Sequence, residues 1–198
     1  MPSLLPRSIP QRFTDPIINP LARLGVTPNL LTLLGVLGNL GAAVLIARGQ
    51  FLAGGILVLA FSALDFLDGA LARATGQATR FGSVFDATMD RISEMAVLFG
   101  VLFFFAERGD EQEVVLASLA MAGSMLVSYV RARAEVVGLP LTEGYFTRPE
   151  RVLVISAGLI IDQVTIALWV LAIVANLTAA QRLFIVWRKA QRDEGKSP

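Results

Sequence analysis

The sequence contains no cysteine and no histidine. Disulfides, thiolate nucleophiles, imidazole bases and metal sites built from Cys or His are therefore excluded. Charge is scarce as well, because only 17% of the 198 residues are Asp, Glu, Lys or Arg, and the net charge is only +1. Any chemistry has to depend on carboxylates, arginines, hydroxyl groups and bound ions.

Apolar residues dominate what remains. Hydrophobic side chains make up 55% of the chain, and its mean hydropathy is positive, which favours a multi-pass membrane protein over a soluble domain. Residues 1–7 lack a long apolar run before a small-residue cleavage site, so we predict no removable signal peptide. We therefore expect an all-α protein that resides in a lipid bilayer and binds no nucleic acid.

Long apolar segments alternate with short polar links. Thr27 and Pro28 are typical of a helix cap followed by a first helical residue. The span that they begin runs to about Ala47, a length of about 30 Å at 1.5 Å per residue, which is enough to cross a bilayer. Further spans are expected over residues 51–70, 87–106 and 114–130.

The positive charges indicate which side of the membrane each link faces. Of the 17 Lys and Arg residues, only Arg48 and Arg108 lie in the links after the first and third spans. Because Lys and Arg favour the cytoplasmic side of short loops, both termini and the other polar links are expected inside the cell. Residues 152–186 must then cross out and back around an outer turn at Asp162. The sequence therefore predicts six transmembrane helices in the cell membrane.

The expected organisation has three parts: a cytoplasmic leader (1–26), a six-helix domain (27–187) and a basic cytoplasmic tail (188–198). In the leader, Ile17, Leu21 and Leu24 fall on one helical face. Asp15–Pro16 resembles a helix start, and Pro20 would kink the helix. We therefore predict an N-terminal interfacial helix, with an irregular basic leader as the alternative.

Four carboxylates stand out against this apolar background. They are Asp65, Asp68, Asp86 and Asp90. The first two are three residues apart and the last two are four apart, so each pair lies on one helical face, and the turn at residues 74–81 lets the faces meet. Counting along the spans from their outer ends puts all four at the inner edge of the bilayer. One Asp at mid-bilayer costs about 2.5–3.5 kcal/mol, so the group requires positive charge nearby.

Two kinds of positive partner fit this group. One is a buried ion-pair network with Arg73, Arg80 and Arg91. The other, which we favour, is a divalent metal, because hard oxygen ligands without His or Cys suit Mg²⁺ or Mn²⁺. A Mg²⁺ site with open positions ordinarily binds phosphate oxygens, and at the lipid interface a phosphate carried on a lipid fits such a site.

The spacing of these residues resembles that of a known family. The segment reads D-x2-D-G-x2-A-R-x8-G-x3-D-x3-D, which is the signature of the CDP-alcohol phosphotransferases. Its fixed positions are Asp65, Asp68, Gly69, Ala72, Arg73, Gly82, Asp86 and Asp90. Agreement at every fixed position and every gap makes a chance match improbable.

Resemblance to this family implies six spans, a homodimer, and two divalent ions, Mg²⁺ or Mn²⁺, per active site. It implies transfer of a phosphatidyl group from a CDP-linked lipid to an alcohol, with release of CMP. Asp65, Asp68 and Asp86 would be the principal metal ligands. Asp90 would complete the metal site and act as the general base on the attacking hydroxyl. The CDP moiety would contact Pro28, Asn29, Leu30, Leu31, Gly69, Arg73 and Thr79.

A second group of residues, all basic, bears on the acceptor. It consists of Arg131, Arg133, Arg148, Arg151 and Arg182, all expected on the cytoplasmic side. Positive-inside topology alone explains some of them, but their arrangement resembles phosphatidylinositol phosphate synthases of actinobacterial type, in which such a pocket binds the phosphate of inositol phosphate. That subfamily has a lysine where this chain has Arg131. Arginine forks also suit a phosphate dianion better than neutral glycerol or serine. The resemblance therefore implies CDP-diacylglycerol and inositol phosphate as substrates.

Other functions stay open. Glycerol 3-phosphate as acceptor would give a phosphatidylglycerophosphate synthase, and an ether CDP-lipid as donor would give an archaetidylinositol phosphate synthase. A divalent-cation transporter would use the four aspartates to line a path, but both spans are apolar toward their outer ends, away from these four aspartates. A purely structural role in the membrane is a third class.

Overall fold

The computed structural model describes residues 11–141 and 146–194, and all its regular elements over that range are helices. The helices are α1 (Gln11–Arg23), α2 (Pro28–Ala47), α3 (Phe51–Ala74), α4 (Arg80–Ala106), α5 (Glu111–Val136), α6 (Arg148–Ile160) and α7 (Val164–Glu194). The prediction of an all-α protein is confirmed.

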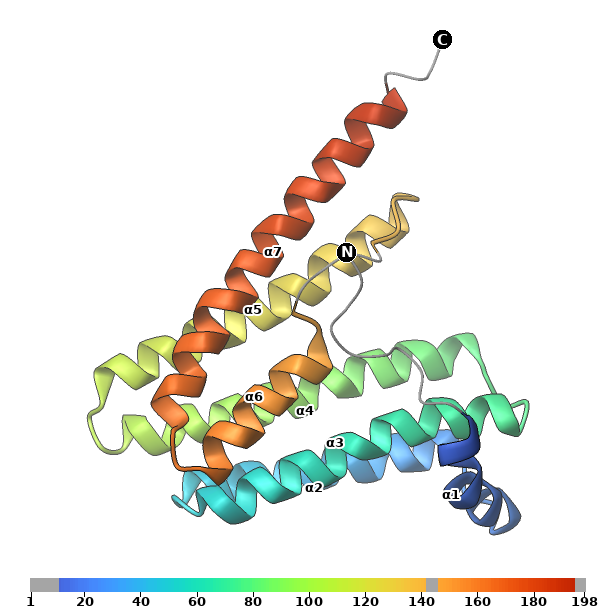
Figure 1. The fold of residues 1–198 in the computed structure, drawn as a ribbon, viewed down its shortest axis with the longest axis horizontal. Helices are drawn as coiled ribbons and strands as arrows, with labels where there is room; N and C mark the ends of the chain where they lie inside the picture. Colours follow the sequence, from blue (N-terminus) through green and yellow to red (C-terminus); the bar gives the residue numbers. More distant parts are fainter. Residues whose placement is uncertain (1–10, 142–145, 195–198) are drawn as a thin grey trace.

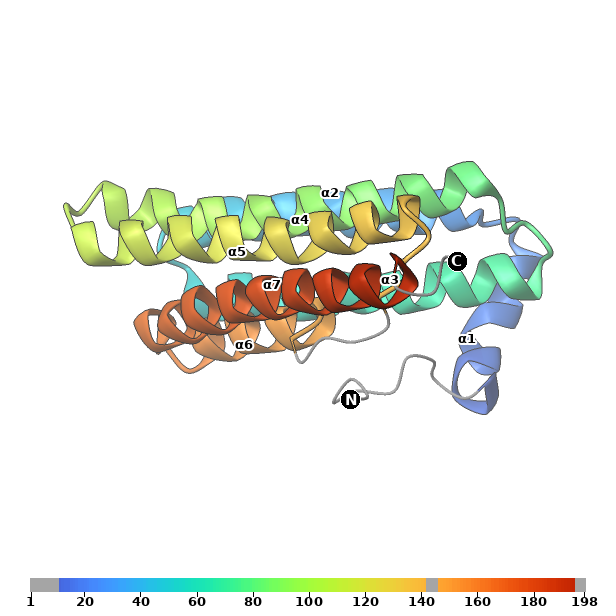
Figure 2. The same ribbon diagram turned by 90° about the horizontal axis from the view of Figure 1, so that it is seen from above.

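Helices α3 and α4 run along α2, α5 and α7 run together at an angle to them, and α1 lies across the end of the bundle where α3 ends (Figure 1). α2 packs against both α3 and α4, α5 packs along α7, and α6 lies against α3 and α7 (Figure 2). One apolar core joins all six helices of the bundle. A second, small cluster of Ile18, Leu31 and Leu71 attaches α1 to α2 and α3.

Local sequence signals explain where the membrane helices begin. The Thr27 hydroxyl accepts a hydrogen bond from the Leu30 N–H at 3.3 Å, so α2 begins where the sequence predicts. Thr79 caps α4 in the same way, accepting from the Gly82 N–H at 2.9 Å. The link 75–79 between α3 and α4 is short. It therefore returns the chain directly and keeps the aspartate-bearing parts of both helices at one end of the bundle.

The C-terminal half differs from expectation in its helix boundaries. α5 continues to Val136, past the predicted end at Val130, and α6 begins at Arg148, inside the polar segment 131–151. The Arg, Ala and Glu residues at the end of α5 are good helix formers, so they extend the helix beyond its apolar part. α6 ends at Ile160, and Asp162, with φ 55°, forms the predicted turn into α7.

Within residues 11–141 and 146–194, four helices are long and apolar enough to cross a membrane, namely α2, α3, α5 and α7. α4 is long enough, but its N-terminal half contains several charged residues, and α6 has only 13 residues. The helices support a multi-pass membrane protein. The count of six spans stays a prediction.

The predicted leader helix is present, but it begins earlier than expected. α1 starts at Gln11 rather than at Asp15–Pro16, so Pro20 and the proline before it both lie inside the helix. Ile18 is buried in the small apolar cluster, whereas Leu24, just after the helix, is 78% exposed. One face of α1 therefore packs on the bundle, and its position at a membrane interface stays a prediction.

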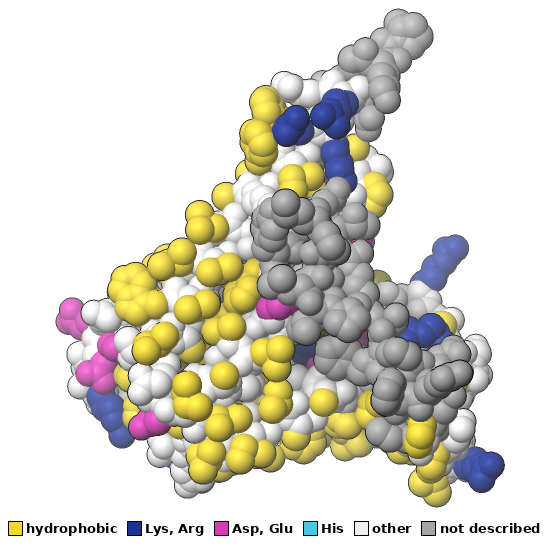
Figure 3. Space-filling model, viewed as in Figure 1, with side chains coloured by type: hydrophobic (Ala, Val, Ile, Leu, Met, Phe, Trp, Pro, Cys, Tyr) yellow, Lys and Arg dark blue, Asp and Glu magenta, His cyan; other side chains and the backbone are white. Residues whose placement is uncertain are grey.

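Charged side chains gather toward the ends of the molecule, and apolar side chains cover the band between them (Figure 3). Exposed leucines of this band include Leu37 on α2, Leu52 on α3 and Leu119 on α5. In the link that joins α4 to α5, the Arg108 guanidinium lies 3.6 Å from the centre of the Phe104 ring. This distribution fits a bundle whose middle faces lipid.

Close packing of α4 on α2 generates a test of the fold. A β-carbon added at Gly100 would lie 2.5 Å from the carbonyl oxygen of Ala43. We therefore expect Gly100→Ala to push the helices apart and to lower the free energy of unfolding by about 1–3 kcal/mol. Gly41→Ala is the matched control, because nothing lies within 4 Å of a β-carbon built there. Thermal unfolding in detergent measures both, and equal midpoints for the two variants would contradict the close contact.

Candidate active site

Arg148 links two of the four aspartates across three helices. Its Nη2 lies 2.7 Å from Asp65 Oδ2 on α3, and its Nη1 lies 2.7 Å from Asp90 Oδ1 on α4. The three side chains are only 12–16% exposed. The start of α6 is fixed by a capping box, in which the Thr147 N–H donates to Glu150 Oε2 at 2.9 Å. One guanidinium therefore holds together carboxylates that would otherwise repel each other.

α2 supports the carboxylates from another side. The Thr32 hydroxyl donates to Asp68 Oδ2 at 2.6 Å, and both side chains are buried. A β-carbon at Gly35 would lie 3.1 Å from Asp65 Oδ1, so the glycine leaves room for that carboxylate. One face of α2 therefore both positions and accommodates the aspartates of α3.

Asp86 completes the group, one turn before Asp90 on α4. Its Oδ1 is buried and has no hydrogen-bond partner among the described residues. An unpartnered carboxylate oxygen in the interior is costly, and an all-oxygen donor set suits a hard divalent cation. No three of the described carboxylates converge on one point as metal ligands do; instead, a guanidinium lies between Asp65 and Asp90. The donor set thus fits a divalent cation, and the role of these residues as metal ligands stays a prediction.

The arginines considered as ion-pair partners of the aspartates are arranged differently. Arg73 and Arg80 are exposed. Arg91 lies 3.5 Å from Glu94. The cation on Asp65 and Asp90 comes instead from Arg148, which the sequence assigned to the acceptor.

Two of the residues predicted to contact CDP meet where α2 and α4 begin. A β-carbon at Gly82 would lie 3.0 Å from Thr79 Oγ1 and 3.6 Å from Asn29 Oδ1. The first turns of two helices therefore approach each other here, and their free N–H groups favour anions. This end of the bundle suits the phosphates of a nucleotide.

The other predicted CDP contacts are distributed unevenly. On α3, a β-carbon at Gly69 would lie 3.5 Å from Arg73 Nη1, so the guanidinium extends over the glycine. Pro28 and Leu30 lie in the first turn of α2, where Leu30 is 44% exposed. Leu31 is only 5% exposed and packs in the small apolar cluster. Its side chain therefore serves packing.

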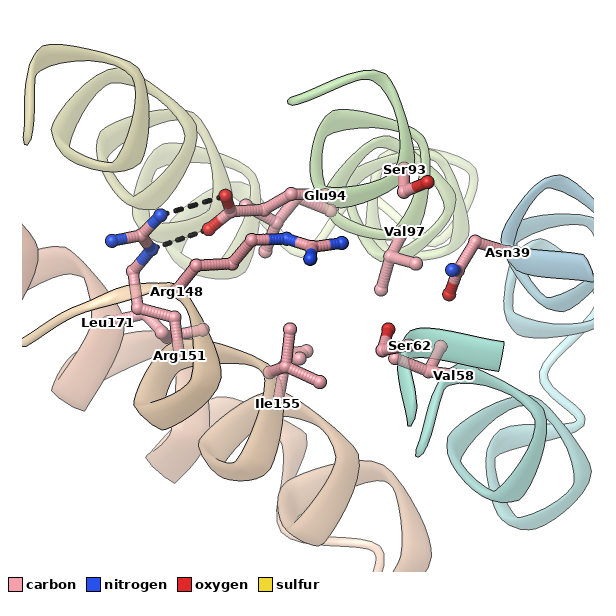
Figure 4. A pocket seen from close by; sticks show the side chains of 12 residues that line it. Asn39, Val58, Ser62, Ser93, Glu94, Val97, Arg148, Arg151, Ile155 and Leu171 are labelled. Atoms are coloured by element: carbon pink, nitrogen blue, oxygen red, sulfur yellow. Dashed lines mark hydrogen bonds and ion pairs between the residues drawn. The ribbon is translucent and has the colours of Figure 1, made fainter. Parts of the chain in front are cut away.

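A second charged cluster is buried beside the aspartates. Arg151 Nε and Nη2 donate to the two carboxylate oxygens of Glu94 at 2.6 and 2.9 Å, and Arg151 Nη1 donates to the Phe146 carbonyl at 3.3 Å. Arg151 is only 2% exposed. The Arg148 guanidinium points away from this pair (Figure 4). The charge of Arg151 is thus neutralised inside the protein, and its role toward an acceptor phosphate stays a prediction.

The remaining arginines of the predicted acceptor group lie on α5 and α7. Arg131 and Arg133 are exposed near the end of α5, where Arg131 Nε lies 3.1 Å from Glu135 Oε1. Arg182 is only 5% exposed, and its Nη1 donates to the Val127 carbonyl at 2.7 Å. The structure therefore separates the five arginines into two exposed ones, one between α5 and α7, and two on the first turn of α6.

A cavity of about 20 Å³ lies behind the charged residues. Its polar lining includes Asn39, Ser62 and Ser93, which lie around the space between α2, α3 and α4, and Glu94, whose carboxylate points toward Arg151 on α6 (Figure 4). Such a volume holds about one water molecule. A nucleotide or a polyol phosphate is far larger, so neither fits inside this cavity.

Thr32 and Glu94 contact the predicted residues but were absent from the sequence prediction. Each leaves a weak signal in the spacing of polar residues. Glu94 extends the series Asp86 and Asp90 by four more residues, so it shares their helical face. Thr32 lies one turn before Gly35 within an apolar span. Neither signal identifies the partner across the bundle.

Comparison with known proteins agrees with this geometry. The family model described as CDP-alcohol phosphatidyltransferase matches residues 25–189. The phosphatidylinositol phosphate synthase of Mycobacterium tuberculosis is 38% identical over 194 residues, covering 92% of this chain and 89% of that protein. The archaetidylinositol phosphate synthase of Pyrococcus horikoshii is 41% identical over 167 residues, covering 83% and 85%.

Solved structures show the same fold. A crystal structure of the M. tuberculosis phosphatidylinositol phosphate synthase with CDP-DAG bound superposes with a TM-score of 0.82 at 37% identity, covering 89% of this chain and 94% of that one. A second structure of that enzyme, in complex with manganese and citrate, also gives 0.82, covering 88% of each chain.

The buried pair of Glu94 and Arg151 predicts a non-additive effect on stability. Removing one partner leaves a buried charge uncompensated, so we expect Glu94→Leu or Arg151→Met to lower the free energy of unfolding by about 3–5 kcal/mol. The double variant removes both charges, so its loss should be smaller than the sum of the losses in the two single variants. A double-mutant cycle of thermal unfolding in detergent measures the coupling. Additive losses would show that the pair does not act as a unit.

Proposed function

The chain belongs to the CDP-alcohol phosphatidyltransferase family, and we propose that it transfers the phosphatidyl group of CDP-diacylglycerol to inositol phosphate, giving phosphatidylinositol phosphate and CMP. The substrates follow from relatives that match nearly the whole chain and are named for this reaction. The observation in this chain that carries the proposal is the group of four aspartates on α3 and α4 at the open end of the bundle, with Arg148 between two of them.

The aspartates supply the groups that phosphatidyl transfer needs. Two divalent ions, Mg²⁺ or Mn²⁺, held by Asp65, Asp68, Asp86 and Asp90, would polarise the pyrophosphate and neutralise the departing CMP. Asp90 accepts the proton of the attacking hydroxyl. That oxygen bonds to the phosphorus bearing the diacylglycerol, the bond from this phosphorus to the bridging oxygen breaks, and its electron pair leaves with CMP. The transfer is direct, without a covalent intermediate on the protein.

The cytidine diphosphate binds where α2 and α4 begin. Thr79, Gly82 and Asn29 approach each other there, and the first turns of both helices direct N–H groups outward. Gly69 permits the Arg73 guanidinium to reach across α3 toward the same end. A diphosphate therefore has both a positive helix-end environment and an arginine in reach.

The phosphate of the acceptor binds to the arginines of α5, α6 and α7. Arg131 and Arg133 are exposed and within one turn of each other. Arg182 contributes from α7, and Arg148 and Arg151 from the first turn of α6. Because Arg151 is paired with Glu94, we place most of the direct phosphate contact on the other arginines.

All six bundle helices cross the cell membrane in this proposal. α4 crosses with residues 87–106, and α6 and α7 cross out and back around Asp162. Both termini and the aspartates then face the cytoplasm, α1 lies at the interface, and the chain works as a homodimer. Support comes from the sequence, in which only Arg48 and Arg108 of the 17 Lys and Arg residues lie in the links expected outside the cell.

An ether CDP-lipid is a second candidate donor. It is supported by the archaetidylinositol phosphate synthase that is 41% identical to this chain. The headgroup reaction is the same for both donors, since only the lipid tails differ. Glycerol 3-phosphate is the nearest rival acceptor because it also presents a phosphate.

Acceptor-dependent release of CMP tests the reaction. With Mg²⁺ and CDP-diacylglycerol we expect CMP release to require inositol phosphate, to stop with EDTA and to return with Mn²⁺. Asp90→Asn should reduce turnover at least about 100-fold, while the helix content measured by circular dichroism stays unchanged. Asp162→Asn, the same change in the outer turn, should leave turnover intact. Release of no CMP, together with uptake of Mg²⁺ into vesicles, would overturn the proposal in favour of a transporter.

Loss of an acceptor arginine should affect one substrate only. We expect Arg133→Ala to raise KM for inositol phosphate at least about tenfold, since a charge-assisted hydrogen bond is lost, and to leave KM for CDP-diacylglycerol unchanged. Arg188→Ala, an exposed arginine of the C-terminal part of α7, is the control. An unchanged KM for inositol phosphate in Arg133→Ala would remove this residue from the site. If CMP were released with glycerol 3-phosphate but not with inositol phosphate, glycerol 3-phosphate would replace inositol phosphate as the acceptor.

A further inference from the structure

Arg148 occupies the carboxylates to which the proposed function assigns metal ions. Its two terminal nitrogens each lie 2.7 Å from one carboxylate, Asp65 on α3 and Asp90 on α4. A divalent ion would have to bind oxygens of the same two groups at about 2.0–2.1 Å. A guanidinium and a metal ion are both positive, so they repel each other, and each contact of Arg148 takes one carboxylate oxygen that a metal ion could otherwise bind. The fork on Asp65 and Asp90 therefore competes with a metal ion at these two carboxylates.

The surroundings allow the side chain of Arg148 to leave while its backbone stays. The capping box of Thr147 and Glu150 fixes the start of α6 independently of the aspartates. The guanidinium is at the end of a flexible stem and is still 14% exposed. In contrast, the neighbouring Arg151 is 2% exposed and donates three hydrogen bonds, so it is committed to its place.

A displaced Arg148 needs another anion. The nearest acid outside the aspartate group in this cluster is Glu94, which already pairs with Arg151 at 2.6 and 2.9 Å and with Arg91 at 3.5 Å. It has little capacity for a third cation. The incoming phosphate of the acceptor offers the missing negative charge, and arginine forks bind phosphate well.

We propose that Arg148 is an exchangeable placeholder cation: it neutralises Asp65 and Asp90 in the metal-free protein, is displaced when a divalent ion binds, and then binds the phosphate of the acceptor. Metal binding and acceptor binding are therefore coupled, with the metal strengthening acceptor binding and the acceptor strengthening metal binding by the same factor. Arg148 is a positioning residue in the first state and an acceptor contact in the second. The acceptor half of this inference rests on the proposed function, whereas the metal half does not.

Titration of the metal-free full chain with Mn²⁺, without substrates, tests the metal half. Free Mn²⁺ is followed by electron paramagnetic resonance of protein in detergent. We expect Arg148→Gln to bind Mn²⁺ at least about fivefold more tightly than the unaltered chain, because the competing cation is gone. Arg80→Gln removes the same charge from an exposed position near the same end and should change the affinity less than twofold. Equal affinities for the two variants, or weaker binding by Arg148→Gln, would overturn the proposal.

A second variant keeps the test valid if Arg148→Gln does not fold. Arg148→Lys retains the charge but cannot bridge two carboxylates with one planar fork. Its Mn²⁺ affinity should lie between those of the unaltered chain and Arg148→Gln. A Lys variant that binds Mn²⁺ no more tightly than the unaltered chain would contradict exchange at the fork.

Equilibrium dialysis with labelled inositol phosphate tests the acceptor half. Binding to the unaltered chain should strengthen at least about fivefold when Mn²⁺ is added, and Arg148→Gln should lose this dependence on metal. Metal-independent binding in the unaltered chain would overturn the coupling. Inositol phosphate could fail to bind under any condition while the Mn²⁺ affinities of the variants follow the expected order. In that case inositol phosphate is not the acceptor, and the exchange at Asp65 and Asp90 still stands.

Discussion

Carboxylates in an apolar interior require a cation, and the arrangement of the residues around the four aspartates follows from this constraint. Asp65 and Asp90 carry like charges on two helices that border lipid, where repulsion is weakly screened. A single guanidinium spans them with two contacts of 2.7 Å. The short link between α3 and α4, the capped start of α6 and the room left by Gly35 all serve to bring these groups together.

Two arginines on one turn of α6 meet this constraint in different ways. Arg151 is enclosed and shares a bidentate pair with Glu94, an arrangement that holds α4 to α6 and is costly to open. Arg148 pairs with carboxylates that we propose as metal ligands, and it remains partly exposed. The first pair is part of the scaffold, and the second belongs to the proposed active site. Burial and partner capacity separate the two roles, although the side chains are identical.

Much of this arrangement could be predicted because it depends on neighbours in sequence. The cap at Thr27, the turn at Asp162 and the facing of the aspartate pairs follow from local rules. The extension of α5 into the polar segment could not be predicted from hydropathy, since helix propensity rather than burial carries it there. The partners of Arg148 and Arg151 also escaped prediction, as did the contact of Thr32 with Asp68.

The sequence by itself determined the membrane character, the all-α fold, the four aspartates and their family spacing. These are set by composition and by periodicities of a few residues, which the chain encodes locally. Only the tertiary structure decided which cation each carboxylate receives. Glu94 and Arg151 are 57 residues apart, and Asp68 and Thr32 are 36 apart, so their contact depends on how whole helices pack. Any of several arginines satisfies the charge requirement, and packing geometry alone selects among them.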